Sequence, residues 1–193
     1  MRTPITAVCG AIALIVLVGC SNTDDGDGPV PAAAAPAEVS TSSEPDPAPA
    51  AKKIGDTHRW EAAVDGLTAT GSTTVLSYEQ PAKSVSSPGE GLGLTDPQWA
   101  VVEVKVCNTG PDNISASQSP WTLVFPDDTR AQTTGLNGGD LPKPEFPTLD
   151  TLVKAGDCLR GKIPFAVERD VRPDRIVYTA SESEPVEWTV PAK

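Results

Sequence analysis

The sequence predicts an antiparallel β-sandwich for residues 54–193. The apolar runs in this region are short, several of them alternate with polar residues, and Gly, Pro, Asn and Asp separate them. No run shows the spacing of an amphipathic helix. About seven or eight short strands joined by turns are typical of a sandwich of this length.

Residues 1–19 have the features of a bacterial lipoprotein signal peptide. Met1-Arg2 precedes an apolar run over 5–18 that is short for a membrane span. Leu17-Val18-Gly19-Cys20 matches the lipobox pattern; an ordinary secretory signal ending in cysteine is the alternative. We expect cleavage after Gly19 and lipidation of Cys20, which would anchor the protein to the outer face of the cell membrane of a Gram-positive actinobacterium.

Residues 20–53 predict a disordered linker after the acylated Cys20. The segment is rich in Asp, Gly, Pro, Ala, Ser and Thr and has almost no large apolar residue. Such a composition cannot bury enough surface to offset the entropy lost on ordering. The folded domain would therefore begin at residue 54.

The charge of the chain excludes some partners. Removal of Arg2 with the signal would leave 14 Lys and Arg against 26 Asp and Glu, a net charge of −12, with one histidine. Nucleic acids and anionic lipid surfaces both select clusters of Lys and Arg. We therefore expect no nucleic-acid partner, and membrane contact through the lipid alone.

Strands are expected wherever the apolar runs occur. In chain order these are residues 57–64, 73–79, 98–108, 121–125, 131–133, 158–168, 175–179 and 186–190. In 98–108 the even-numbered residues from Ala100 to Val106 are apolar, and Glu103, Lys105 and Cys107 alternate with them. In 158–168 the odd-numbered positions 159–167 oppose the polar ones. These sets define a core face and a solvent face.

All four tryptophans lie in or beside these runs. Trp121 and Trp188 alternate with other apolar residues and are expected in the core. Trp60 and Trp99 have mixed neighbours and are the expected exceptions.

Cys107 and Cys158 are the cysteines that remain in the folded part. Because an exported chain meets an oxidising compartment, we expect them to form a disulfide, which would stabilise the fold by about 4 kcal/mol. Metal ligation or redox catalysis is the alternative, but CxxC spacing and a nearby histidine are missing. No metal or cofactor is expected.

Cys107, Trp121 and Cys158 follow the order and rough spacing of the two cysteines and the tryptophan of immunoglobulin domains. The expected sandwich is therefore immunoglobulin-like. Both cysteines alternate with the apolar set, and Gly156 stands where a tyrosine corner would place tyrosine. We therefore expect the bridge near strand ends or on an outer face, not between the sheets.

Four framework segments carry a family resemblance. These are residues 99–110, which end in Asn-Thr-Gly, together with 121–125, 161–167 (Gly-Lys-Ile-Pro-Phe-Ala-Val) and 175–178. Over roughly 57–190 the chain resembles immunoglobulin-like domains of unknown function in lipoproteins and secreted antigens of Gram-positive bacteria, related to a mycobacterial secreted immunoprotective antigen. The resemblance implies a fold and brings no catalytic residue.

Enzyme signatures are missing from the sequence. It has no Gly-x-Ser-x-Gly, no phosphate-binding glycine loop and no HExxH, and His58 has no histidine or cysteine companion. The acidic pair Asp127-Asp128 between Phe125 and Ala131 is interpreted as a hairpin turn, with a metal or acid–base pair as the alternative. We expect no enzymatic activity.

The longest expected loop, residues 134–154, is the candidate partner-binding segment; a second Pro/Gly-rich loop spans 86–95. Such loops often recognise partners, although a mobile connection without a partner is the alternative. The candidate contact residues are Asn137, Asp140, Lys143, Glu145 and Phe146.

The sequence thus predicts a non-catalytic binding or interaction module whose partner is an unidentified envelope protein or polymer. The alternatives are a small-molecule or metal-binding lipoprotein that assists a transporter and a small hydrolase of envelope polymers. The first would need a closable cleft, and the second a pocket with converging acids.

Overall fold

The structure is a computed structural model that describes residues 50–64, 67–82, 86–89, 92–180 and 183–192. The expected signal peptide, Cys20 and the linker as far as residue 49 lie outside these residues. Within the described part, no helix is long and apolar enough to cross a bilayer.

The elements of the described residues are strands, which confirms the all-β prediction. They are β1 (Lys52–Lys53), β2 (Thr57–Val64), β3 (Leu67–Glu79), β4 (Pro97–Asn108), β5 (Ile114–Ala116), β6 (Trp121–Val124), β7 (Arg130–Gln132), β8 (Thr151–Val153), β9 (Cys158–Glu168), β10 (Arg175–Tyr178) and β11 (Val186–Thr189).

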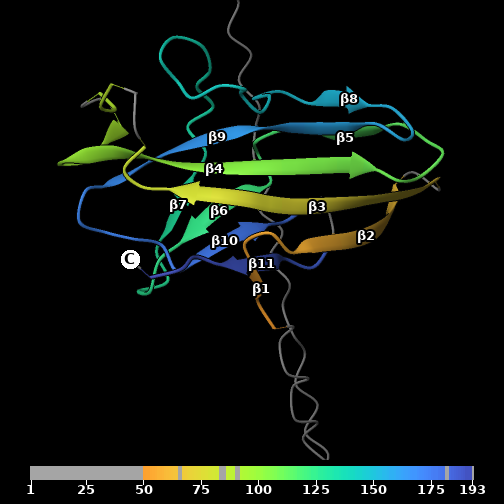
Figure 1. Cartoon of the computed structure of the whole chain (residues 1–193), viewed down its shortest axis with the longest axis horizontal. Coiled ribbons are helices and arrows are strands. Elements are labelled where there is room, and N and C mark those ends of the chain that lie inside the picture. The colour runs from red at the N-terminus through yellow and green to blue at the C-terminus, as the bar shows by residue number, and fades with distance from the viewer. Residues whose placement is uncertain (1–49, 65–66, 83–85, 90–91, 181–182, 193) are drawn as a thin grey trace, which may run out of the picture. The chain divides into compact units, whose positions relative to one another are not determined.

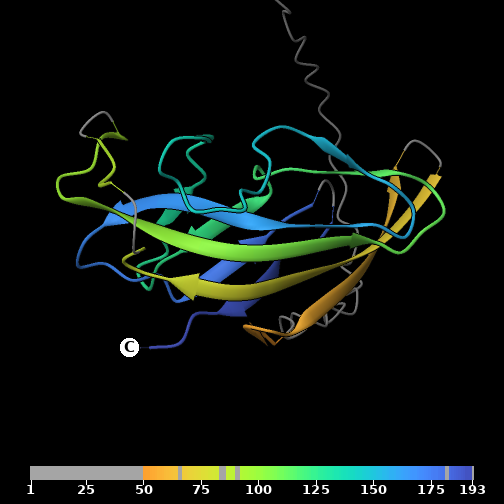
Figure 2. The same ribbon diagram turned by 45° about the horizontal axis from the view of Figure 1, so that its top comes forward.

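Two sheets form the sandwich. One has the order β1-β11-β10-β6-β7 and the other the order β2-β3-β4-β9, while β5 and β8 form a separate two-stranded ribbon. Figure 1 shows β3, β4 and β9 passing in front of β6, β10 and β11, and the turned view of Figure 2 separates the two layers. The paired strands are antiparallel except for β1, which lies parallel to β11.

The core lies between the inner faces of the two sheets. Its fully buried side chains include Val75, Val102, Val104, Ile163 and Phe165 from one sheet and Trp121, Leu123, Ile176 and Trp188 from the other. Valine and isoleucine suit these positions because branching at Cβ favours extended backbone and packs well on a pleated surface. The inner face predicted from residue parity in β4 and β9 is confirmed.

Trp99 and Trp60 differ in how they meet their expectation. Trp99 is 7% exposed, but it is not part of the core cluster between the sheets, as expected, whereas Trp60 is half-buried and packs against that cluster, which was not expected. At this end of β4 both faces are covered, since residues from Pro97 to Val102 are all buried. The Ser87 hydroxyl donates to the Pro97 carbonyl at 2.9 Å, which holds the neighbouring loop against this end.

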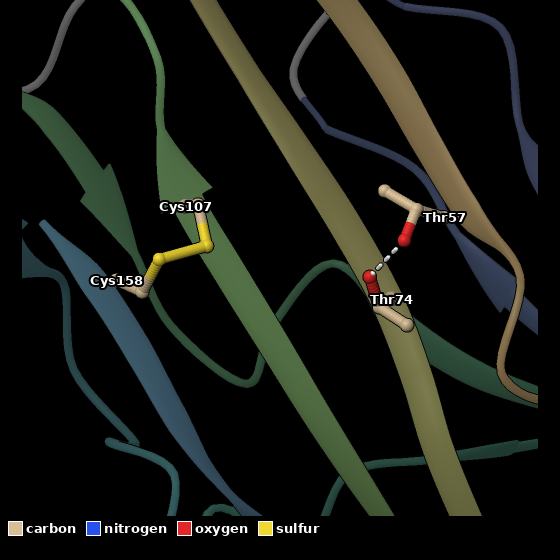
Figure 3. Close-up of a disulfide and its surroundings, with 4 residues drawn as sticks. All are labelled: Thr57, Thr74, Cys107 and Cys158. Atoms are coloured by element: carbon tan, nitrogen blue, oxygen red, sulfur yellow. Dashed lines mark hydrogen bonds between the residues drawn. A yellow bond between two sulfur atoms is a disulfide. The ribbon is translucent and has the colours of Figure 1, made fainter. Parts of the chain in front are cut away.

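Cys107 and Cys158 form the expected disulfide, and it lies where residue parity puts it. The two cysteines are opposite each other at the end of β4 and the start of β9. Both belong to the outer row of their strands, so the bond joins neighbouring strands of one sheet. Figure 3 shows this bridge together with the hydrogen bond of 2.8 Å between the hydroxyls of Thr57 and Thr74, which joins β2 to β3.

Several strands differ from the sequence-based expectation. β3 begins at Leu67, six residues before the expected start, because residues 68–72 are small or polar and give no apolar signal although they pair with β2. The short strands β1, β5 and β8 were not expected. β1 also lies before residue 54, the expected start of the domain.

Candidate binding cleft

A cleft of about 400 Å³ opens where β7, at the edge of one sheet, lies beside β9, at the edge of the other. Its lining combines the apolar side chains of Leu92, Leu94, Phe125, Ala131, Ala166, Val167 and Val171 with the polar residues Asp127, Thr129, Arg130, Gln132, Thr134 and Glu168. Leu92 and Val171 are each about 40% exposed, so the apolar surface continues to the rim. Concave sites with this mixture of groups are where ligands usually bind.

One wall of the cleft is the hairpin between β6 and β7, which confirms the turn predicted at Asp127-Asp128. The Phe125 carbonyl accepts from the amide of Asp128 at 2.9 Å, and Asp128 has a φ of 63°, which Asp tolerates better than most residues. The Asp127 carboxylate accepts from both the amide and the hydroxyl of Thr129, and these bonds lower the pKa of Asp127. Asp127 therefore holds the turn and is not free for acid–base chemistry.

The same hairpin determines which main-chain groups face the cleft. The Phe125 amide donates to the Thr129 carbonyl at 2.9 Å, so the next hydrogen-bonded pair is Leu123 with Ala131. In an antiparallel pair the residues between such positions point their N–H and C=O groups away from the partner strand. The main chain of Arg130 and Gln132 is thus directed away from β6, along the cleft.

The opposite rim is fixed by charge-assisted hydrogen bonds. Glu168 at the end of β9 accepts from the amides of Thr95 and Asp96 at 2.9 and 3.0 Å. Asp96 binds Arg169 through two bonds of 2.6 and 2.8 Å, and this guanidinium lowers the pKa of Asp96. These contacts hold the loop that carries Leu92 and Leu94, which lies within the second loop predicted from sequence.

The candidate loop 134–154 begins at the cleft, because Thr134 lines it. The Asn137 and Asp140 side chains are exposed, and each has one weak contact, with Thr148 at 3.5 Å and with Ser86 at 3.3 Å. Lys143 is exposed and pairs with Glu145. These three residues are available to a partner.

Glu145 and Phe146 have structural roles in the same loop. The Glu145 carboxylate accepts from Lys143 and from the Gly138 amide, and these bonds lower its pKa. Phe146 is fully buried in the core. The structure therefore removes Phe146 from the candidate contact surface and makes it the anchor of the loop.

Gly161 explains how Phe146 fits. A Cβ on Gly161 would lie 2.5 Å from the Phe146 nitrogen. The glycine that opens the Gly-Lys-Ile-Pro-Phe-Ala-Val segment thus allows the loop main chain to approach β9.

The remaining candidates are separate from the cleft. His58 lies in β2, where burial and the nearby Lys52 lower its pKa. No group of three or more His, Cys, Asp and Glu that could hold a metal ion occurs among the described residues. A second pocket of about 340 Å³, lined in part by Ser115, Ser117, Ser119 and Asp150, lies elsewhere and was not expected from sequence.

Sequence reasoning did not anticipate the cleft. Val167 and Val171 carry no signal that separates them from core residues, since the cleft forms only where two sheet edges meet. The Pro/Gly-rich segment that contains Leu92 and Leu94 was the one available indication.

Comparison with known proteins supports the fold. A family described as a domain of unknown function, DUF4352, matches residues 68–186. No curated protein matches the chain in sequence. Among solved structures, the secreted protein MPT63 of Mycobacterium tuberculosis is 14% identical with a TM-score of 0.55, covering 75% of this chain and 100% of that one.

Two Bacillus subtilis proteins are also similar. The yjhA protein is 18% identical with a TM-score of 0.45, covering 66% of this chain and 79% of that one. A candidate lipoprotein, ycdA, is 18% identical with a TM-score of 0.45, covering 68% of this chain and 38% of that one. The family match and the similarity to MPT63 confirm the resemblance inferred from the framework segments.

Proposed function

Because the chain belongs to the DUF4352 family of domains of unknown function, for which no catalytic activity is indicated, we propose that it is an extracytoplasmic, lipid-anchored binding module. The proposed ligand is an extended, partly apolar polypeptide segment of an envelope protein. The observation that carries this proposal is the cleft between β7 and β9, with its apolar floor and open rim.

The cleft suits a polypeptide for two reasons. Its apolar side chains that reach the surface, Leu92, Leu94 and Val171, provide area that a ligand side chain can cover. The main chain of Arg130 and Gln132 points along it, so an extended peptide can hydrogen-bond there as an added strand. A small apolar molecule would use the first feature only.

The proposed location and anchor rest on the sequence and on one structural neighbour. MPT63 is a secreted protein, and Cys20 ends a lipobox. Replacement of Cys20 by Ala should release the protein from the membrane fraction and abolish incorporation of labelled fatty acid. A Cys20→Ala protein that still fractionates with membrane and still carries the label would contradict the anchor.

Photo-crosslinking in intact cells tests the cleft. A photoreactive residue is placed at Leu92 in the full chain, with the exposed Leu149, which does not line the cleft, as the matched control. We expect a specific protein crosslink from Leu92 alone. Gln132→Pro, which removes an N–H directed toward the cleft, should abolish it, whereas Gln132→Ala should preserve it.

The outcomes separate the possible ligands. A crosslink that survives Gln132→Pro but disappears when Leu94 is replaced by Asp would indicate an apolar ligand without strand pairing and would overturn the polypeptide proposal. Equal crosslinking from Leu92 and Leu149 would overturn the cleft as the binding site.

A further inference from the structure

The outer edges of the two sheets differ in how they are protected. The edge of β9 is covered, because the Phe146 amide donates to Lys162 at 3.0 Å and the Lys162 amide donates to Pro144 at 2.8 Å. Pro164 in the same strand has no N–H. β1 and β7 have only two and three residues. β2 has eight residues, and β3 is its one partner within the described part of the chain.

Among the described residues, no further strand pairs with this edge of β2. Natural proteins usually protect an edge of this length, because it can pair with another chain. Figures 1 and 2 show β2 as the outermost strand of its sheet.

The hydrogen bonds of β3 determine which groups of β2 are unpaired. The Thr70 carbonyl accepts from the amide of Thr109, toward β4, and the Val75 carbonyl accepts from the amide of Gly55, toward the β2 side. Successive residues of a strand point their main-chain groups to opposite sides. The odd-numbered residues of β3 from Gly71 to Val75 therefore direct their N–H and C=O groups toward β2. Gly71 is opposite Trp60, so Trp60 points its main chain toward β3. The main-chain groups of Thr57, Arg59, Glu61 and Ala63 point outward.

The side chains of Arg59 and Glu61 add charge to this edge. Both are exposed, and neither appears in an ion pair within the described residues. They lie on the outer face of the sheet, on either side of Trp60. A two-fold axis at Trp60 would place Arg59 of each copy opposite Glu61 of the other.

This register is selected by charge and by hydrogen bonding together. A shift of the axis to Arg59 would put arginine opposite arginine, and a shift to Glu61 would put glutamate opposite glutamate. With the axis at Trp60, Arg59 and Glu61 are also the residues whose N–H and C=O groups point outward, so each such pair can exchange two hydrogen bonds. Thr57 and Ala63 form the flanking pair.

We propose that β2 is a self-association surface, through which two copies of the chain pair antiparallel about a two-fold axis at Trp60. The two four-stranded sheets then become one continuous sheet, in which β2 is no longer an edge. The partner is a second copy because the charge pattern is complementary to itself. This dimer leaves the cleft between β7 and β9 free and does not rest on the proposed ligand.

Charge exchange tests the dimer with the full chain in a non-ionic detergent, followed by sedimentation. The wild type should show a concentration-dependent dimer. Arg59→Glu and Glu61→Arg should each weaken it about tenfold, because attraction is replaced by repulsion at both pairs. The double variant Arg59→Glu/Glu61→Arg should restore it. A mixture of the two single variants should form a heterodimer, because each opposes unlike charges in the other.

A main-chain variant tests the strand pairing. Glu61→Pro removes an N–H that points away from β3 and should abolish the dimer, while Glu61→Ala should retain it. Cooperative unfolding of each variant, followed by tryptophan fluorescence, verifies that the fold is intact. Glu61→Gly serves as a second main-chain variant, and since it keeps the N–H it should still dimerise.

Three results would overturn the proposal. The first is a monomeric wild type at every concentration, and the second is a dimer that both single charge variants leave unchanged. The third is failure of the mixed variants to associate.

Discussion

Gly161 lies so close to the main chain at Phe146 that one added atom, a Cβ, would interfere with docking of the loop 134–154. The Gly161 Cα faces the main chain at Glu145 and Phe146. Backbone atoms cannot move aside to make room for a new Cβ, whereas the end of a flexible side chain could. Phe146 then places a fully buried ring in the core. The docking of a 21-residue segment, 134–154, thus depends on a glycine in a strand and an aromatic residue in the loop.

Gly161→Ala should lower the free energy of unfolding by about 1–3 kcal/mol, because the new Cβ would overlap the Phe146 nitrogen. Gly89→Ala is the control, since a Cβ there meets open space, and should change it by less than about 0.5 kcal/mol. Urea unfolding monitored by fluorescence measures both. Equal stabilities of the two variants would contradict the close approach.

Phe146→Ala should lower the free energy of unfolding by about 3–5 kcal/mol, as expected for truncation of a buried aromatic side chain. Leu149 in the same loop is 79% exposed, and Leu149→Ala should be nearly neutral. A small effect at position 146 in urea unfolding would mean that the loop does not depend on its anchor.

Among the elements, β4 and β9 combine core packing with the disulfide. β4 is an inner strand of its sheet, and β9 is the edge strand that the loop covers. Together they supply much of the core, and they carry the disulfide on the outer face. Covalent linkage and core packing are therefore on opposite faces of the same strand pair.

Replacement of both Cys107 and Cys158 by Ala should lower the free energy of unfolding by about 4 kcal/mol in the chain-entropy description, for a sequence separation of 51 residues. The fold should persist, because neither cysteine belongs to the core. Circular dichroism reports the fold, and urea unfolding with and without reductant reports the loss. A double variant without native β signal would show that the bond is required for folding.

The sequence predicted the long strands well, for a physical reason. A run such as β4 alternates valine with polar residues, and this alternation follows directly from burial of one face. The position of the disulfide followed from the same parity. β5 and β8 could not be predicted, since three residues such as Ile114–Ala116 become a strand only through pairing with Thr151–Val153.

The site was less predictable than the fold. Asn137, Asp140 and Lys143 were predicted as partner contacts because loop composition is visible in sequence, and the three side chains are exposed. The cleft was not, because it arises from the meeting of β7 and β9, whose separation in space depends on every strand between them.

For the molecule as a whole, the two tyrosines of the chain provide a pH test of the fold. Burial raises the pKa of Tyr78, although the charge of Arg172, 5.0 Å from the ring centre, opposes this. Burial also raises the pKa of Tyr178, against a hydrogen bond with Thr73. Both phenols therefore keep their protons more tightly in the folded than in the unfolded chain.

Stability should fall at alkaline pH as a result. Below the unfolded pKa of about 10, both states carry the phenol protons and the full stability is present. Above it, the unfolded chain loses protons that the folded chain keeps, so unfolding becomes more favourable up to the folded pKa values. Tyrosinate absorbance should rise together with the loss of native fluorescence. A tyrosinate signal near pH 10 in a chain with native fluorescence would contradict the burial.

The parallel pairing of β1 with β11 has a mechanical consequence. Lys52 and Lys53 pair with Trp188 and Thr189, and the Trp188 indole donates to the Asp56 carbonyl at 2.9 Å, just after β1. A pulling force that enters the domain from the residues before Lys52 would load these contacts before any other strand. β1 has two residues, and neither belongs to the buried core. The pairing of β1 with β11 can therefore separate under tension and form again when the force falls, while the two sheets stay packed together.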